Sequence, residues 1–138
     1  MTTNAPIIIA HRGASVLAPE NTAAAFDKSF AEGVSGIELD LQLSADGIPV
    51  AFHDRNLSKI GLRKKKISDL PLKELKKLDL GGWFGDSFLG EKIMTFDEIL
   101  RHYGGKTQLF VELKIRKGKA SASHHRKLLQ DTLALIHE

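Results

Sequence analysis

Strand-like and helix-like segments alternate along this chain. Short apolar runs at residues 7–10, 37–42, 48–54 and 107–114 are typical of buried strands, and amphipathic patterns separate most of them. A helix that connects two strands of one sheet leaves them parallel, so this order predicts an α/β fold with a parallel sheet. Residues 55–93 are polar, glycine-containing and irregular, and we expect them to form an insertion after the third strand.

Capping residues predict where the helices begin and end. Asn21 is expected to cap the first helix, and Gly33 to end it. Pro71 is expected to start a short helix within the insertion, and Thr95 with Glu98 forms the pattern of a capping box. The last helix is expected to bury one face formed by Leu128, Leu129, Leu133 and Ile136.

Composition excludes several classes of protein. The net charge is only +3, from 20 basic and 17 acidic residues, so charge alone gives no reason to expect a nucleic-acid or membrane partner. The absence of cysteine excludes disulfides and thiolate metal sites. The N-terminus has no basic segment before its short apolar run, and no stretch approaches the roughly 20 apolar residues of a membrane helix. We therefore expect a cytoplasmic chain without stable membrane insertion. The basic run at residues 63–66 lacks interleaved aromatic residues and is interpreted as a solvated loop.

The segment "IELDLQLSADG", residues 37–47, places two carboxylates on an otherwise apolar strand. Glu38 and Asp40 share one face because side chains two positions apart in a strand point to the same side. The fourth predicted strand repeats the pattern, with Glu112 and Lys114 on one face of "VELK".

Other chemically capable side chains stand where the predicted strands end. His11 and Arg12 follow the first strand, and His53 and Asp54 end the third. Functional groups of parallel α/β sheets gather at the carboxyl ends of the strands, so we expect these side chains to share one rim with the carboxylates.

This combination indicates metal-assisted cleavage of a phosphate ester. Three buried carboxylates without a cation are unfavourable, and all-oxygen ligands favour Mg²⁺ or Ca²⁺ over zinc or copper. Arginine and lysine bind phosphate oxygens, and histidine donates or accepts a proton near neutral pH. The expected cofactor is therefore a divalent cation, Mg²⁺ or Ca²⁺.

The stretches "AHRGASVLAPENTAAAF", "GIELDLQLSADGIPVAFHD", "TFDEIL" and "VELK", in this order, closely resemble the glycerophosphodiester phosphodiesterase family. The resemblance covers about residues 7–116. It implies a TIM barrel that cleaves glycerophosphodiesters into an alcohol and sn-glycerol 3-phosphate. It also implies roles for matched residues: metal ligation by Glu38, Asp40 and Glu112, acid–base catalysis by His11 and His53, phosphate binding by Arg12 and Lys114, and support of the cluster by Glu20.

The chain departs from the family pattern in two places. After "FHD" the family commonly shows Leu-x-Arg-Thr, whereas "RNLSKIGL" here lacks the Arg-Thr pair, which affects the expected substrate-side loop. A TIM barrel also usually needs about 250 residues and eight strand–helix units. We expect residues 1–138 to form a single partial barrel domain, a half-barrel of about four units with the insertion at 55–93. Truncation, pairing of two copies, or a separate chain that supplies the other half would each account for this length.

Several alternatives stay open. A related phosphodiester-cleaving barrel would act by internal attack of a neighbouring hydroxyl, and an inactive half-barrel would serve as an assembly module. Arg12 is also suited to a structural ion pair with Glu20, and Lys114 to a salt bridge with Glu112. Trp83 is expected to belong to a small packing anchor under the insertion.

Overall fold

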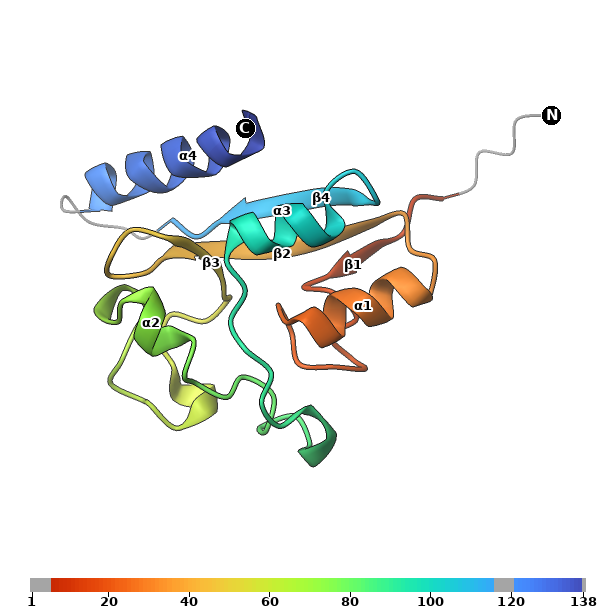
Figure 1. The fold of residues 1–138 in the computed structure, drawn as a ribbon, viewed down its shortest axis with the longest axis horizontal. Coiled ribbons are helices and arrows are strands. Elements are labelled where there is room, and N and C mark those ends of the chain that lie inside the picture. Colours follow the sequence, from red (N-terminus) through yellow and green to blue (C-terminus); the bar gives the residue numbers. More distant parts are fainter. Residues whose placement is uncertain (1–5, 116–120, 138) are drawn as a thin grey trace.

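The computed structural model of the chain describes residues 6–115 and 121–137 (Figure 1). The sheet consists of β1 (Ile9–His11), β2 (Gly36–Leu43), β3 (Pro49–Ala51) and β4 (Gln108–Leu113). β2 is central, with β1 parallel to it on one edge and β4 parallel to it on the other. The register between β2 and β4 sets Asp40 opposite Glu112. The parallel sheet therefore brings acidic residues from two distant segments side by side.

The third strand departs from the predicted parallel arrangement. β3 pairs antiparallel with the last residues of β2, with Leu41 opposite Ala51. The connection at residues 44–48 is too short for a parallel crossover, which needs about a dozen residues or more. Gly47 adopts a φ of 82° in this turn, and Ser44 Oγ donates to Asp46 Oδ1 at 2.6 Å. A hairpin therefore extends one end of an otherwise parallel, open, partial barrel sheet.

Four α-helices and three short 3₁₀ turns complete the described elements. The helices are α1 (Ala23–Ala31), α2 (Leu72–Leu75), α3 (Phe96–Tyr103) and α4 (Ser121–His137). The 3₁₀ turns, all within the insertion, are η1 (Ser58–Ile60), η2 (Ile67–Asp69) and η3 (Asp86–Phe88). None of the helices in the described residues is long and apolar enough to cross a membrane.

The N-cap prediction was correct at α3 and wrong at α1, whereas Gly33, with a φ of 70°, follows the end of α1 as predicted. Glu98 N–H donates to Thr95 Oγ1 at 3.1 Å and Thr95 N–H donates to Glu98 Oε2 at 2.8 Å, which is the predicted capping box. The N-cap of α1 is Thr22, not Asn21. Asn21 has a left-handed backbone, with a φ of 58°, and its side chain bonds to Asp40 instead.

Two apolar clusters stabilise the fold. The main core lies between the sheet and the helices and contains Phe26, Ile37, Leu39, Leu41, Phe96, Ile99, Tyr103 and Leu128. A second core under the insertion contains Val50, Phe52, Leu57, Ile67, Leu75, Leu80 and Ile93. The insertion at residues 55–93 is thus a packed layer with its own core, and its basic run at residues 63–66 lies in a loop at the surface.

The apolar face predicted for the last helix was partly wrong. Leu128 is buried in the main core, and Leu135 packs against the same core. Leu129, Leu133 and Ile136 are each about half exposed. The four predicted side chains spread over more of the helix circumference than the sheet covers. Of these four, only Leu128 is therefore buried.

Candidate active site

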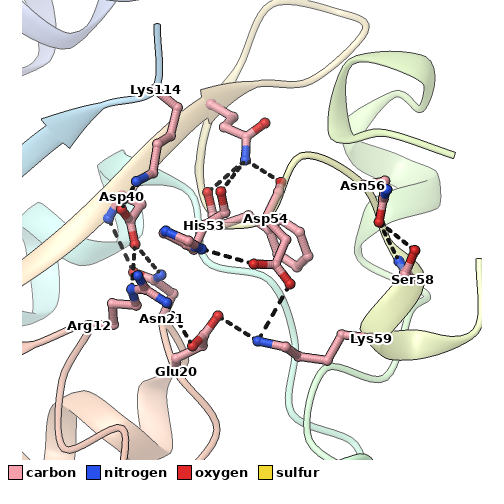
Figure 2. Close-up of polar contacts among 12 residues, drawn as sticks. Arg12, Glu20, Asn21, Asp40, His53, Asp54, Asn56, Ser58, Lys59 and Lys114 are labelled. Atoms are coloured by element: carbon pink, nitrogen blue, oxygen red, sulfur yellow. Dashed lines mark hydrogen bonds and ion pairs between the residues drawn. The ribbon is translucent and has the colours of Figure 1, made fainter. Parts of the chain in front are cut away.

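Asp40 is the buried centre of the polar cluster at the sheet. Its side chain is fully shielded from solvent on β2, where burial of a carboxylate requires compensating charges or hydrogen bonds. Asn21 Nδ2 donates to Asp40 Oδ2 at 2.9 Å, and Asp40 N–H donates to Asn21 Oδ1 at 3.2 Å. Arg12 Nε lies 3.4 Å from Oδ2 and Lys114 Nζ lies 2.7 Å from Oδ1. Figure 2 shows the three partner side chains converging on this carboxylate.

The loop that supplies Arg12 and Asn21 has an unusual backbone. Within the described residues, these two are the non-glycine positions with positive φ, at 59° and 58°. Left-handed geometry is unfavourable for residues with a Cβ, and it persists where the surrounding contacts hold it. Gly13 follows with a φ of 79°, and a Cβ there would lie 2.8 Å from the Ala25 backbone. The "HRG" and "PENT" stretches therefore fold tightly around the carboxylate of Asp40.

Glu38 lies beside Asp40 on the same face of β2. Arg12 N–H donates to Glu38 Oε2 at 2.9 Å, and His11 Nε2 lies 3.9 Å from the same oxygen. Burial is the main influence that raises the pKa of Glu38, and the negative charges of Asp40 and Glu112 act in the same direction. The Arg12 hydrogen bond and His11 only partly offset this. The Glu38 carboxyl group therefore has too little positive charge around it to balance its burial and its acidic neighbours.

Lys114 bridges two of the three acids. Its Nζ lies 2.7 Å from Asp40 Oδ1 and donates to Glu112 Oε1 at 2.6 Å. Desolvation acts to lower the pKa of Lys114, but the close negative charges of Asp40 and Glu112 outweigh it, and the net pKa is raised. The salt bridge to Glu112 that the sequence allowed is therefore present.

The three acids fit a divalent cation. Glu38, Asp40 and Glu112 each present a carboxylate oxygen, and these oxygens all lie within 4.8 Å of one another. Asp40 Oδ1 is buried and receives no well-directed hydrogen bond despite the close Lys114 ammonium. An all-carboxylate donor set with a buried, incompletely satisfied oxygen suits Mg²⁺ or Ca²⁺.

A second polar cluster lies beyond Arg12. Arg12 Nη1 donates to Glu20 Oε2 at 3.1 Å, and Lys59 Nζ donates to Glu20 Oε1 at 2.8 Å. Lys59 Nζ also lies 3.5 Å from Asp54 Oδ2, and Asp54 Oδ1 lies 2.9 Å from His53 Nδ1. Partial burial acts to raise the pKa of Asp54, but the His53 contact and the Lys59 charge prevail and lower it. Figure 2 shows this continuous chain from Arg12 to His53.

The structure places all eight predicted site residues in these two connected clusters. It adds two that the sequence reasoning missed, Asn21 on Asp40 and Lys59 on Glu20 and Asp54, and it places Asp54, which was expected on this rim, against His53. A signal for Lys59 was present. In "LSKI" it occupies the arginine position of the Leu-x-Arg-Thr pattern, so a positive charge is kept at that position. Ile60 stands where the pattern has threonine.

Trp83 combines packing with a polar contact. Its ring contacts Phe84 edge-on and its Nε1 donates to the Leu80 carbonyl at 2.8 Å, but Trp83 is 41% exposed and lies outside the second core, so it is not the buried anchor that was expected. The ring also lies 4.5 Å from Lys59 Nζ, in cation–π geometry.

Comparison with known proteins identifies several phosphodiesterases that are similar to this chain in sequence and in structure. Glycerophosphodiester phosphodiesterase of Caldanaerobacter subterraneus is 43% identical over 112 residues, which are 81% of this chain and 46% of that protein. A phosphodiesterase of Oleispira antarctica, solved in complex with the product sn-glycerol-3-phosphate, is 37% identical with a TM-score of 0.82 and is matched over 96% of this chain and 52% of its own. Glycerophosphodiester phosphodiesterase of Agrobacterium tumefaciens gives a TM-score of 0.77 at 31% identity, over 96% of this chain and 64% of its own.

These similarities cover about half to two thirds of each relative. The chain spans about half the length of the first two proteins. Residues 11–137 match the glycerophosphoryl diester phosphodiesterase family. With the strand-end cluster of acids and histidines, this match shows that the chain belongs to that family.

Proposed function

We propose that this chain carries the phosphate-cleaving site of a metal-dependent glycerophosphodiester phosphodiesterase, which produces an alcohol and sn-glycerol 3-phosphate. The observation that carries the proposal is the convergence of Glu38, Asp40 and Glu112 beside His11. The product named with the Oleispira antarctica structure supports the same substrate class.

Glu38, Asp40 and Glu112 are the proposed ligands of Mg²⁺ or Ca²⁺. When bound, such an ion would polarise a phosphate oxygen and offset negative charge that develops at phosphorus. The pKa of Glu38, which is raised mainly by burial and further by the charges of Asp40 and Glu112, agrees with this assignment, because a bound cation would offset both effects.

Arg12 and Lys114 are the proposed phosphate-binding residues. In this structure both serve as partners of Asp40, and Arg12 also pairs with Glu20. Lys114 becomes available to a phosphate oxygen once its two carboxylates have another cation. Arg12 keeps its orientation through Glu20, which supports the guanidinium while leaving other donors for a ligand.

His11 and His53 are the proposed acid–base pair. Hydrolysis requires removal of a proton from the attacking water and delivery of a proton to the departing alkoxide as the phosphorus–oxygen bond breaks. His53 contacts Asp54 through Nδ1, so its Nε2 is the nitrogen that remains for proton transfer. His11 is largely exposed on its strand end and close to Glu38.

We further propose that residues 1–138 form a partial barrel that functions as part of a complete barrel. Apolar side chains of β4 and α4, including Phe110, Leu129 and Ile136, are about half exposed. Such surface is typically covered in an assembled protein. The remaining strands would cover it, whether they belong to the same polypeptide, a second copy of this chain or a separate chain.

Glycerophosphocholine hydrolysis, followed by phosphorus NMR with and without a chelator, tests this proposal. We expect sn-glycerol 3-phosphate as product, loss of turnover with chelator, and recovery with Mg²⁺ or Ca²⁺. The assay should be run on this chain and on a version extended to full barrel length. Turnover that is insensitive to chelation would contradict the metal assignment, and no turnover by the extended version would contradict the proposed activity.

A further inference from the structure

The second acidic group of the site already contains a cation from the chain itself. Glu20, His53 and Asp54 present ligand-type atoms within 4.8 Å of one another, a spacing that resembles a metal site. The ammonium of Lys59 contacts both carboxylates, at 2.8 Å from Glu20 Oε1 and 3.5 Å from Asp54 Oδ2. Lys59 therefore supplies the positive charge that holds these two acids together.

The insertion fixes the position of this ammonium. Lys59 lies in η1, two residues after the fully buried Leu57, and Ser58 N–H donates to Asn56 Oδ1 at 3.1 Å. The Trp83 ring lies 4.5 Å from the ammonium, and its own Nε1 is hydrogen-bonded to the backbone. The buried side chain of Leu57 anchors the backbone that carries Lys59, and the Trp83 ring contacts its ammonium.

The ammonium acts on His53 through Asp54. One oxygen of Asp54 contacts Lys59 and the other lies 2.9 Å from His53 Nδ1, so the carboxylate is fixed at both ends. Gln42 Nε2 donates to the carbonyl oxygens of Phe52 and Asp54, at 2.8 and 2.9 Å, and fixes the backbone that carries the histidine. Figure 2 shows the other edge of the His53 ring on the side of Asp40.

We propose that Lys59 is a positioning residue that, through Asp54, holds His53 with its Nδ1 proton on the carboxylate and its Nε2 toward the Asp40 side of the cluster. The catalytic part of this proposal rests on the proposed function of His53. The insertion at residues 55–93 then contributes directly to the site, because it delivers the ammonium. Without Lys59, the carboxylates of Glu20 and Asp54 would repel each other, and Asp54 would lose the contact that fixes its orientation.

Nitrogen NMR of the histidine side chains tests this without any need for turnover. The variants are Lys59→Met, Lys59→Arg and Asp54→Asn, with Lys77→Met as the matched control. Lys77 also pairs with one acid, at 2.7 Å from Glu74 Oε1, but this pair is exposed on the surface beside α2. His53→Gln identifies the His53 signals.

The expected pattern is specific. The unaltered chain and Lys77→Met should show a single His53 tautomer with the proton on Nδ1. Lys59→Met should give a mixture of tautomers or exchange-broadened signals, and Lys59→Arg should restore the single form. Asp54→Asn should move the proton to Nε2, because the amide can donate to Nδ1. A single Nδ1 proton that persists in Lys59→Met would overturn the proposal.

Kinetics on an active, full-length barrel give the second readout. Lys59→Met should lower kcat roughly 10-fold with KM little changed, an effect of the size seen when a residue that orients a reactive group is removed. Lys59→Arg should recover most of the rate. Equal kcat in Lys59→Met would also overturn the proposal. A full-length protein without activity, but with the expected tautomer pattern, would contradict the proposed function and leave the positioning role supported.

Discussion

Asn21 and Asp40 form a reciprocal pair in which each residue supplies both a donor and an acceptor. The Asn21 amide donates to the Asp40 carboxylate at 2.9 Å, and the Asp40 backbone N–H donates to the Asn21 side-chain oxygen at 3.2 Å. This pair connects the loop after β1 to the centre of the sheet. It also accounts for the left-handed backbone at Asn21, since that conformation places the side chain against β2.

Substitutions at Asn21 should separate the hydrogen bonds from the backbone conformation. Asn21→Gly should lower the free energy of unfolding by about 1–3 kcal/mol, because the buried Asp40 groups lose their partners. Asn21→Ala should lower it by about 1 kcal/mol more, since alanine is disfavoured at positive φ. Urea unfolding monitored by circular dichroism measures both. Equal stability of the two variants would show that the backbone is not held in this conformation.

Histidine and carboxylate substitutions should affect different properties. His11→Ala and His53→Ala are each expected to abolish turnover while leaving metal affinity nearly unchanged, because neither ring belongs to the acidic group around Asp40. Glu112→Gln should instead weaken binding of Mg²⁺ or Ca²⁺, since the neutral amide replaces a charged ligand. Isothermal titration with each metal and the phosphorus NMR assay measure the two properties.

The control for these variants is Glu74→Gln, which changes an exposed acid paired with Lys77. It should alter neither metal affinity nor turnover. Loss of metal binding in a histidine variant would show that the roles of imidazole and carboxylate have been exchanged.

Sequence reasoning predicted the parallel core and the acidic cluster because both follow from local pattern. Side chains two positions apart share a strand face, so the alternation of residue types alone pairs Glu38 with Asp40 and Glu112 with Lys114. The direction of β3 depends instead on the length of a connection. Residues 44–48 are too few for a parallel crossover, so the antiparallel pairing could also have been anticipated from this turn.

The missed residues depend on contacts that sequence spacing does not encode. Lys59 meets Glu20 across 39 positions of sequence, through an insertion whose path is set by its own small core. Asn21 was a plausible helix cap by type, and only the neighbouring Thr22 and the tertiary contact with Asp40 decide against it. Such choices between local and distant hydrogen bonds are made by the fold as a whole.

The capping box at α3 should make stability depend on pH. Partial burial acts to raise the pKa of Glu98, but the hydrogen bonds from Lys76 and Thr95 outweigh it and lower the net pKa. A carboxyl group whose pKa is lower when folded stabilises the protein above its unfolded pKa, which is about 4.5 for Glu98. That contribution is lost as the pH falls through the lower, folded value.

Glu98→Ala should therefore lower the free energy of unfolding by about 1 kcal/mol at pH 7. Near pH 3 the loss should be smaller. Glu74→Ala removes an exposed pair with Lys77 and should change stability by less than about 0.5 kcal/mol at either pH. Thermal unfolding at both pH values measures the difference. A loss in Glu98→Ala that is the same at pH 3 and pH 7 would contradict the role of its charge.

Two adjacent leucines of α4 test which side of this helix is covered. Leu128 is 1% exposed and Leu129 is 47% exposed, although they are identical in type and adjacent in sequence. Leu128→Ala should lower the free energy of unfolding by about 2–5 kcal/mol, because it leaves a cavity in the main core. Leu129→Ala should change it by less than about 0.5 kcal/mol in this chain alone. Chemical unfolding at two protein concentrations measures both changes. If Leu129→Ala lowers the free energy of unfolding nearly as much as Leu128→Ala, and the effect grows with protein concentration, then copies of the chain cover this face in solution.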